Sequence, residues 1–289
     1  MIKKLSALGH LKANEAEYIM LTYRCIHMKL NYASVLEYIV NLTLHEIDAR
    51  TVLSKSKIPG ADYCLNPYVG CFHGCRYCYA TFMKRFTGHT EAWGSFVDVK
   101  INTPEVLRRQ LQRASRGNIM LSSVTDAYQP IESRYKLTRQ CLEVISEYQF
   151  PVSILTKSPL VLRDVDLIQQ IKDIEVGITV TTDDDRIRRL FAPQAPPISA
   201  RIRTLRKLHE HGIATYAFIG PVLPMNPEEL AAKISPYVND VLVDRMNYVS
   251  KTREIYRKNK LDMWLDTGFT FNIVQRLKKA LDKKNVRVC

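Results

Sequence analysis

The sequence contains no run of roughly 18 apolar residues, so a membrane-spanning helix is not expected. Near the start, Gly9, His10 and Lys12 interrupt the chain before an apolar segment of the export type can form. No internal repeat or low-complexity segment is present. These absences predict a soluble cytoplasmic protein. In that reducing compartment its seven cysteines are expected to be metal ligands or buried thiols rather than disulfides.

Acidic residues are scarce relative to basic ones. The chain of 289 residues has 42 Lys and Arg against 29 Asp and Glu, a formal net charge of +13. This balance favours an anionic partner, such as nucleic acid, a phosphorylated substrate or a membrane surface. The excess is uneven, because residues 251–289 hold eleven basic and four acidic side chains. A solvated helical face also explains such a segment. The charge therefore narrows the class of binding partner but does not identify a reaction.

Short β-branched apolar runs alternate with helical patterns along most of the chain. Because strands that alternate with helices pair in parallel, the pattern predicts an α/β fold. The number of runs predicts a partial (β/α)₆ barrel of the TIM type, open rather than closed, with its chemistry at the carboxyl ends of the strands. The predicted strands are residues 63–69, 119–124, 152–156, 176–182, 214–222 and 240–244, and the predicted helices are 103–114, 137–148, 160–171, 199–211 and 227–237.

Three segments are expected from the changes in pattern along the chain. Residues 1–45 have helical potential without strand alternation, and form either an N-terminal helical extension or an over-extended start, since Met28 lies within them. Residues 46–250 form the core barrel. Residues 251–289 form a basic C-terminal helical segment.

Three cysteines fall within eight residues, as Cys71, Cys75 and Cys78. A short loop relaxed by Gly74 can turn three thiolates toward one metal centre. Cuboidal iron–sulfur clusters need four ligands, so this motif would leave one iron open to an exogenous ligand. A zinc site that adds His73 or Cys64 is the chemical alternative, although zinc sites favour paired C-x₂-C units.

The spacing C-x₃-C-x-Φ-C, with Tyr77 as the aromatic residue, resembles the signature of the radical S-adenosylmethionine (radical SAM) superfamily. The surrounding residues resemble the branch related to spore photoproduct lyase, whose members are often labelled DNA repair photolyase-like. The resemblance covers roughly residues 46–250, and three stretches carry it: NPYVGCFHGCRYCYA at 66–80, VTDAYQPIE at 124–132 and LTRQC at 137–141.

This resemblance implies a metal centre and a cofactor. A 4Fe–4S cluster would be held by Cys71, Cys75 and Cys78, and the amino and carboxylate groups of SAM would chelate the open iron. One electron from an external reductant of the flavodoxin or ferredoxin type would cleave SAM to a 5′-deoxyadenosyl radical. That radical abstracts hydrogen from the substrate, while the protein supplies position and excludes water.

Polar residues near the ends of the later strands are the candidates for holding SAM. Lys157 is the candidate partner for the carboxylate, because members of this branch use a lysine and hydroxyl residues at such positions. Asp126 could line the site or pair with nearby arginines. The complete set of cofactor candidates is Tyr77, Ser122, Ser123, Asp126, Lys157, Thr179 and Thr181.

One position departs from the lyase pattern. Spore photoproduct lyase returns a hydrogen atom from a cysteine just upstream of the equivalent aspartate, where this chain has Ser122 and Ser123. An O–H bond is too strong for that step. Cys141 is not a replacement, because it falls on the apolar stripe of a predicted helix and is expected to be core.

The sequence therefore predicts a radical SAM enzyme resembling spore photoproduct lyase, with an unidentified substrate that could be nucleic acid. Two alternatives remain open at this stage. One is a radical SAM reaction on a small metabolite, RNA or a peptide. The other is a metal- or cluster-binding protein without turnover. Basic side chains on two predicted helices, including Arg108, Arg109, Arg201 and Arg206, could contact phosphate or be solvated.

Overall fold

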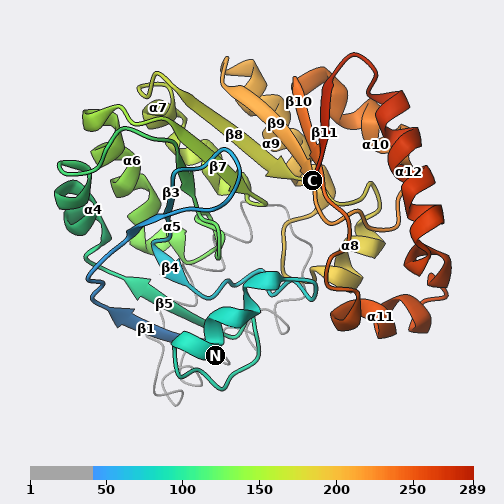
Figure 1. Cartoon of the computed structure of the whole chain (residues 1–289), viewed down its shortest axis with the longest axis horizontal. Coiled ribbons are helices and arrows are strands. Elements are labelled where there is room, and N and C mark those ends of the chain that lie inside the picture. The colour runs from blue at the N-terminus through green and yellow to red at the C-terminus, as the bar shows by residue number, and fades with distance from the viewer. Residues whose placement is uncertain (1–41) are drawn as a thin grey trace, which may run out of the picture.

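The computed structural model describes residues 42–289, which form an open parallel sheet with helices along its outer side (Figure 1). The sheet has eight strands in the order β11-β10-β9-β8-β7-β6-β3-β2. All neighbours are parallel except β2 and β3. Within residues 42–289 the edge strands β2 and β11 do not pair with each other, so the sheet is a partial barrel, as the sequence predicts. Its strands are β2 (Leu53–Lys55), β3 (Tyr63–Leu65), β6 (Ile119–Leu121), β7 (Val152–Thr156), β8 (Ile174–Thr179), β9 (Ala214–Ile219), β10 (Asp240–Val243) and β11 (Asn285–Val288).

Helices connect successive strands. In Figure 1 the left-hand group contains α4 and α6, which pack against each other, and α12 runs beside α10 at the right-hand edge. The α-helices are α4 (Thr103–Leu111), α5 (Glu132–Tyr135), α6 (Leu137–Tyr148), α7 (Val165–Ile168), α8 (Asp185–Phe191), α9 (Ile198–Glu210), α10 (Pro227–Ile234), α11 (Val249–Lys258) and α12 (Thr267–Ala280). The 3₁₀ helices are η1 (Tyr79–Phe86), η2 (Pro159–Asp164), η3 (Ser235–Tyr237) and η4 (Asp262–Leu265).

The central strands are buried because helices cover the sheet, as parallel sheets require. In β7 the side chains of Val152, Ile154 and Thr156 are buried and alternate with half-buried ones. Ile154 belongs to the same core cluster as Ile145 of α6 and Leu205 of α9. The period-2 pattern of the strand and the apolar stripe of each helix therefore meet in one core.

The predicted strand over residues 63–69 is two strands in two sheets. Tyr63–Leu65 is β3 of the main sheet, whereas β4 (Tyr68–Val69) pairs antiparallel with β5 (Phe96–Lys100). Pro67 has no N–H for a ladder, and the Asn66 side chain turns to bond the backbone N–H of Val124 at 3.1 Å. The chain therefore changes sheets at this point. A third strand, β1 (Thr43–Ile47), pairs parallel with β5 and completes the small sheet.

The C-terminal segment contains α12, most of α11 and the added strand β11, which extends the main sheet beside β10. Residue 251, the expected start of this segment, falls inside α11, and residue 45, the expected end of the first segment, falls inside β1. The predicted helix over 160–171 is divided into η2 and α7. The expected N-terminal extension lies outside the described residues, apart from positions 42–45.

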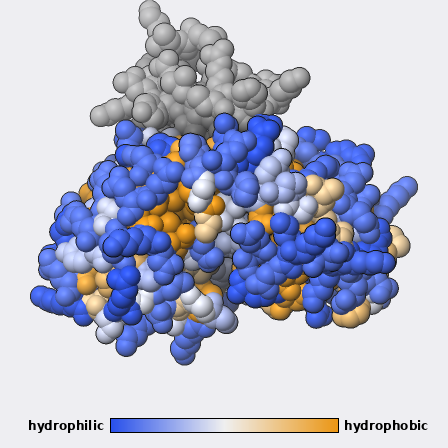
Figure 2. All heavy atoms as spheres, turned by 90° about the horizontal axis from the view of Figure 1, so that it is seen from above, coloured by the Kyte–Doolittle hydropathy of each residue, from blue (hydrophilic) through white to orange (hydrophobic). Residues whose placement is uncertain are grey.

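The molecular face in Figure 2 is mostly hydrophilic, with hydrophobic atoms visible in separate areas between charged side chains. Among the described residues, no helix has both the length and the apolar character needed to cross a membrane.

Candidate functional site

The three clustered cysteines lie on a tightly turned loop between β4 and η1. Gly70 precedes the loop at φ +83°, and a side chain there would collide with the Phe96 carbonyl. The Gly74 N–H donates to the Cys71 carbonyl at 3.2 Å, and the Cys78 N–H donates to the Cys75 carbonyl at 3.0 Å. These two consecutive turns fold the eight-residue segment back on itself.

The thiols of this loop lie in a poorly solvated setting. Cys71 and Cys75 are buried and Cys78 is half-buried. Burial, with Asp126 and the neighbouring thiols, raises the pKa of Cys71, and burial raises the pKa of Cys78 to about 11. Burial disfavours the anionic form of Cys71 and Cys78, and a bound metal would reverse this, because metal coordination deprotonates a thiol outright. The donor set therefore fits an iron–sulfur cluster with one open iron.

The loop is anchored to the segment that follows β6. The Phe72 N–H donates to Gln129 Oε1 at 2.7 Å, and Thr125 Oγ1 donates to the Gly70 carbonyl at 2.6 Å. On its other side the Arg76 N–H donates to the Phe191 carbonyl at 2.9 Å, which ties the loop to α8. Backbone groups of the loop are thus bonded by residues from two distant parts of the chain.

Asp126 is the hydrogen-bonding centre of this frame and is buried. Its Oδ1 accepts from Thr156 Oγ1 at 2.6 Å and from the Tyr128 N–H at 3.0 Å. Its Oδ2 accepts from His73 Nε2 at 3.1 Å and from the Lys157 N–H at 2.9 Å. Burial alone would raise the pKa of Asp126, but His73, Lys157 and Thr156 together hold it below its ordinary value. Asp126 therefore links the cysteine loop to the carboxyl end of β7.

The two serines after β6 differ in their surroundings. Ser122 is buried at φ +71°, and its hydroxyl oxygen has no hydrogen-bond partner among the described residues. The Ser123 hydroxyl accepts from Asn66 Nδ2 at 3.2 Å, and the Ser123 carbonyl accepts a hydrogen bond from the Tyr79 hydroxyl. A buried hydroxyl without a partner, on a residue with a left-handed backbone, is unusual and is typical of a functional site. Ser122 is therefore a candidate site residue beside the cysteine loop.

The remaining candidates lie at the ends of β7 and β8. Lys157 is half-buried, and its ammonium lies near Asp126 and Cys78, where it helps to lower the pKa of Asp126 and opposes the burial that raises the pKa of Cys78. Thr179 and Thr181 are buried, and the Thr181 carbonyl accepts the Leu223 N–H at 3.2 Å. The structure thus places Ser123, Asp126 and Lys157 around the loop, with the two threonines on the next strand end.

Tyr77 points away from solvent into a second core cluster with Phe191, Leu223 and Tyr256. Burial, with the adjacent Cys75, raises the pKa of Tyr77. The packed ring therefore helps to hold the backbone between Cys75 and Cys78 in place.

Arg201 is on neither a phosphate-contacting nor a solvated helix face, the two alternatives that the sequence leaves open for it. It is fully buried in α9, where Nε donates to the Pro196 carbonyl at 2.9 Å and Nη1 donates to the Thr179 carbonyl at 3.1 Å. Its Nη2 has no partner among the described residues. Burial lowers the pKa of Arg201 while Tyr77 and Cys75 raise it, which places the guanidinium near the cysteine loop. The periodicity could have identified it, because Ile198, Arg201, Leu205 and Leu208 share one buried stripe of the helix.

The chain is similar in sequence to several proteins. An uncharacterized protein of Methanocaldococcus jannaschii is 40% identical over 204 residues, which cover 70% of this chain and 77% of that protein. An uncharacterized protein of Mycobacterium tuberculosis H37Rv is 32% identical over 63% of this chain and 57% of its own length. The radical SAM Nα-GlyT isomerase of Pseudomonas phage M6 is 28% identical over 55% of this chain and 32% of its own length.

Solved structures of spore photoproduct lyase share the fold. The lyase complexed with dinucleoside spore photoproduct superposes with a TM-score of 0.62 over 86% of this chain and 82% of that chain, at 15% identity. A lyase mutant with bound AdoMet and dinucleoside spore photoproduct gives 0.62 over 84% and 81%, at 14% identity. The model of the radical SAM superfamily matches residues 65–234, a segment that includes the cysteine loop, Asp126, Lys157 and Arg201. The chain therefore belongs to the radical SAM superfamily, and this membership implies an enzyme that uses a 4Fe–4S cluster and SAM.

Proposed function

We propose that this protein is a radical SAM enzyme of the spore photoproduct lyase type that removes a hydrogen atom from a nucleic-acid substrate. Cys71, Cys75 and Cys78 would hold the cluster, and SAM would occupy the fourth iron. The observation that carries this proposal is the three-thiol loop, with Cys71 and Cys75 buried and Cys78 half-buried, bonded through Asp126 to the carboxyl ends of β6 and β7. When bound and reduced by a flavodoxin- or ferredoxin-type protein, the cluster supplies the electron that cleaves SAM to methionine and the 5′-deoxyadenosyl radical.

The chain's own residues would position SAM and exclude water. Lys157 would bind its carboxylate, since a half-buried ammonium pairs well with a carboxylate. Thr179 and Thr181 would contact the ribose. Ser122 would offer its unpartnered hydroxyl to a polar group of the cofactor. Asp126 would act through position, because each of its oxygens already accepts two hydrogen bonds from the protein.

Nucleic acid is supported as the substrate class by a row of exposed aromatic rings that begins directly after Cys78. Tyr79 stacks on Phe82 with ring centroids 6.4 Å apart, and Phe82 meets Phe86 edge-on at 6.4 Å. Phe86 leaves 73% of its surface exposed, far more than a packing residue would. The exposed Arg76 and Arg85 lie on the same segment. Bases stack on such rings while cations meet the phosphates. The printed name of the lyase complex, which includes dinucleoside spore photoproduct, agrees with a nucleoside substrate.

Transfer of a hydrogen atom back to the product would differ from that of the lyase. By the resemblance in sequence, Ser122 and Ser123 would stand where the lyase has its cysteine, and Cys141 is enclosed in the core with no exposed surface. We infer that neither serine returns a hydrogen atom to the product radical, so the product need not be the one that the lyase forms.

The enzymatic proposal is tested by anaerobic reconstitution with iron and sulfide, followed by reduction in the presence of SAM. Formation of 5′-deoxyadenosine is expected from the unaltered chain. Cys75→Ala should abolish both the visible iron–thiolate absorbance and 5′-deoxyadenosine. Cys289→Ser is the matched control, because Cys289 is exposed at the last position and lies outside the loop. Product formation that survives Cys75→Ala would contradict the ligand assignment.

The substrate proposal has a separate test. Binding of a mixed-sequence single-stranded DNA should weaken steeply as salt rises, because each neutralised phosphate releases counterions. Phe86→Ala should weaken binding about 5- to 100-fold, since base–aromatic stacking contributes about 1–3 kcal/mol per base. Phe271→Ala is the control, because Phe271 is also an exposed ring but lies on helix α12, outside the segment that follows Cys78. Binding that is absent at low salt, or equal losses in both variants, would reject nucleic acid while leaving SAM cleavage intact.

A further inference from the structure

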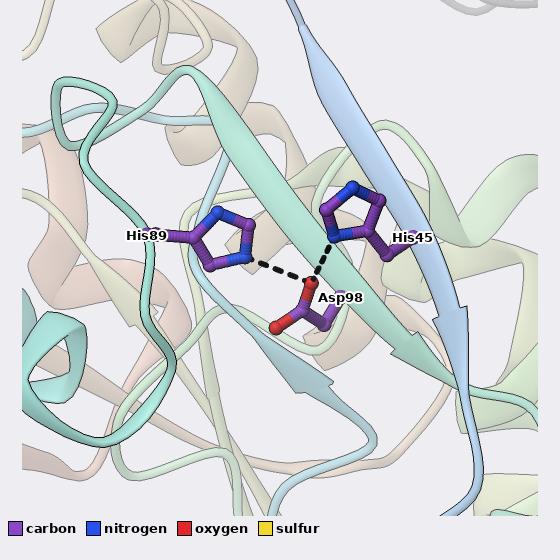
Figure 3. Close-up of side chains that lie close together, drawn as sticks. All are labelled: His45, His89 and Asp98. Atoms are coloured by element: carbon purple, nitrogen blue, oxygen red, sulfur yellow. Dashed lines mark hydrogen bonds and ion pairs between the residues drawn. The ribbon is translucent and has the colours of Figure 1, made fainter.

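Two histidines and an aspartate, none of them part of the cysteine loop, meet on the small sheet (Figure 3). His45 comes from β1 and is paired in register with Asp98 of β5, while His89 comes from the loop between η1 and β5. Asp98 Oδ1 lies 3.4 Å from His45 Nδ1 and 2.9 Å from His89 Nε2. Figure 3 shows both rings directed at this one carboxylate oxygen. Their donor atoms all lie within 4.8 Å of one another.

The His89 ring is held in a fixed orientation. Its Nδ1 lies 3.0 Å from Glu91 Oε2, and the ring stacks on Phe96 with centroids 3.9 Å apart. Its side chain is only 5% exposed. When Nδ1–H donates to Glu91, the lone pair of Nε2 is directed toward Asp98. A carboxylate that fixes the tautomer of a histidine in this manner is the usual support of a metal-binding imidazole.

The spacing and the open side both suit a cation. Ligands at about 2.0–2.2 Å from a shared ion, at angles of about 90° to 109°, lie about 2.8–3.6 Å apart, and two of the separations here are 2.9 and 3.4 Å. His45 leaves 57% of its side chain exposed, and the three groups line a cavity of about 530 Å³ together with Met83 and Phe86. Room therefore remains for water or an exogenous ligand beside the three protein atoms.

We propose that His45, His89 and Asp98 bind one divalent transition-metal ion of the Zn²⁺ class, with Glu91 orienting His89. Two imidazole nitrogens favour such an ion over Mg²⁺ or Ca²⁺, which prefer oxygen ligands. The ion would join β1 to β5 and to the loop before it. The site does not use the cysteines and does not depend on the reaction proposed above.

The test uses the full chain, reconstituted with iron and sulfide and titrated with Zn²⁺ against a chromophoric chelator. One zinc ion per chain should bind. Zinc-edge X-ray absorption should show only nitrogen or oxygen neighbours at about 2.0–2.1 Å, whereas zinc held by cysteine would show sulfur at about 2.3 Å. Because iron absorbs at a different edge, the cluster does not interfere.

Variants give the second readout. His45→Ala should weaken zinc binding at least tenfold, and its exposure makes misfolding a poor explanation for such a loss. Glu91→Gln should weaken binding by about 10- to 100-fold, the usual effect of removing a group that orients a ligand. The exposed His211 provides the control His211→Ala, which should bind zinc normally. Three results would each overturn the proposal: sulfur neighbours around the zinc, no bound zinc, or equal zinc affinity in His45→Ala and the unaltered chain. The group would then be an ion pair of His89 with Asp98 and Glu91.

Discussion

Asp126→Asn is the change that tests the candidate site most directly, because it keeps the size of the side chain and alters its charge and its hydrogen bonding. Oδ1 now accepts from Thr156 and Tyr128, and Oδ2 accepts from His73 and Lys157. An asparagine amide can accept at only one of these two positions. Whichever way the amide turns, a backbone N–H, that of Tyr128 or that of Lys157, faces an NH₂ group instead of an oxygen.

The magnitude follows from these contacts. A buried donor left without an acceptor costs about 1–3 kcal/mol, and a lost hydrogen bond to a charged group costs about 1.5–3 kcal/mol. At least one donor is orphaned and the charge that His73 meets is lost, so the free energy of unfolding should fall by about 3–5 kcal/mol. Because the same bonds hold the cysteine loop against β7, 5′-deoxyadenosine formation should fall as well.

The pH dependence has a definite sign. The folded-state pKa of Asp126 lies below its ordinary value of 3.8, since His73, Lys157 and Thr156 outweigh the effect of burial. A lowered carboxyl pKa contributes stability that is present above the unfolded pKa and is lost as pH falls through the folded one. The stability difference between the unaltered chain and Asp126→Asn should therefore be constant from pH 5 to pH 8 and shrink below about pH 4.

Urea denaturation of the cluster-free chain measures this difference without a contribution from cluster loss. Asp166→Asn is the matched control, because Asp166 is an exposed carboxylate paired with Arg139 and should contribute less than about 1 kcal/mol. Equal losses in the two variants, or a difference that grows as pH falls below 4, would refute the central role given to Asp126.

Three further changes separate binding from structure. Lys157→Met should raise the KM for SAM about 10- to 100-fold with a smaller effect on kcat, because a charged hydrogen bond contributes about 1.5–3 kcal/mol; steady-state kinetics of 5′-deoxyadenosine formation measures both. Arg201→Met should lower the free energy of unfolding by about 2–4 kcal/mol through two orphaned carbonyls, and a redox titration should show a cluster that is harder to reduce without the nearby positive charge. Cys141→Ala should cost about 1 kcal/mol in urea denaturation and leave iron content unchanged, because that thiol lies in the core.

The sequence predicts the fold well wherever one local pattern decides the structure. The six predicted strands all contribute to the main sheet, because β-branched runs bounded by turn residues have no other place to bury both faces. The prediction fails where a contact between residues far apart in the sequence determines the local structure. The run over 63–69 has strand character throughout, yet the Asn66 side chain bonds residues after β6 and moves β4 into another sheet. Nothing in the local sequence reports a partner 57 positions away.

For the candidate site, residue type was predictable and environment was not. The cysteine spacing identifies the loop, but Asp126, one candidate among several acids, becomes its hydrogen-bonding centre only through His73 and the end of β7. Arg201 was misjudged because arginine is usually exposed, although its position on an apolar helical stripe pointed inward. The separate His45, His89 and Asp98 group could not be found from spacing, since three segments of the small sheet bring it together.

The small sheet gives the two candidate centres a shared support. Val69 of β4 is paired in register with Asp98 of β5, and the cysteine loop begins two residues after Val69. His45 pairs with the same aspartate from the other side of β5. An ion at His45, His89 and Asp98 would therefore restrain the strand from which Cys71 departs. Zinc binding should then reduce amide exchange in β4 as well as in β1, whereas protection confined to β1 would indicate that the ion fixes the N-terminal strand alone.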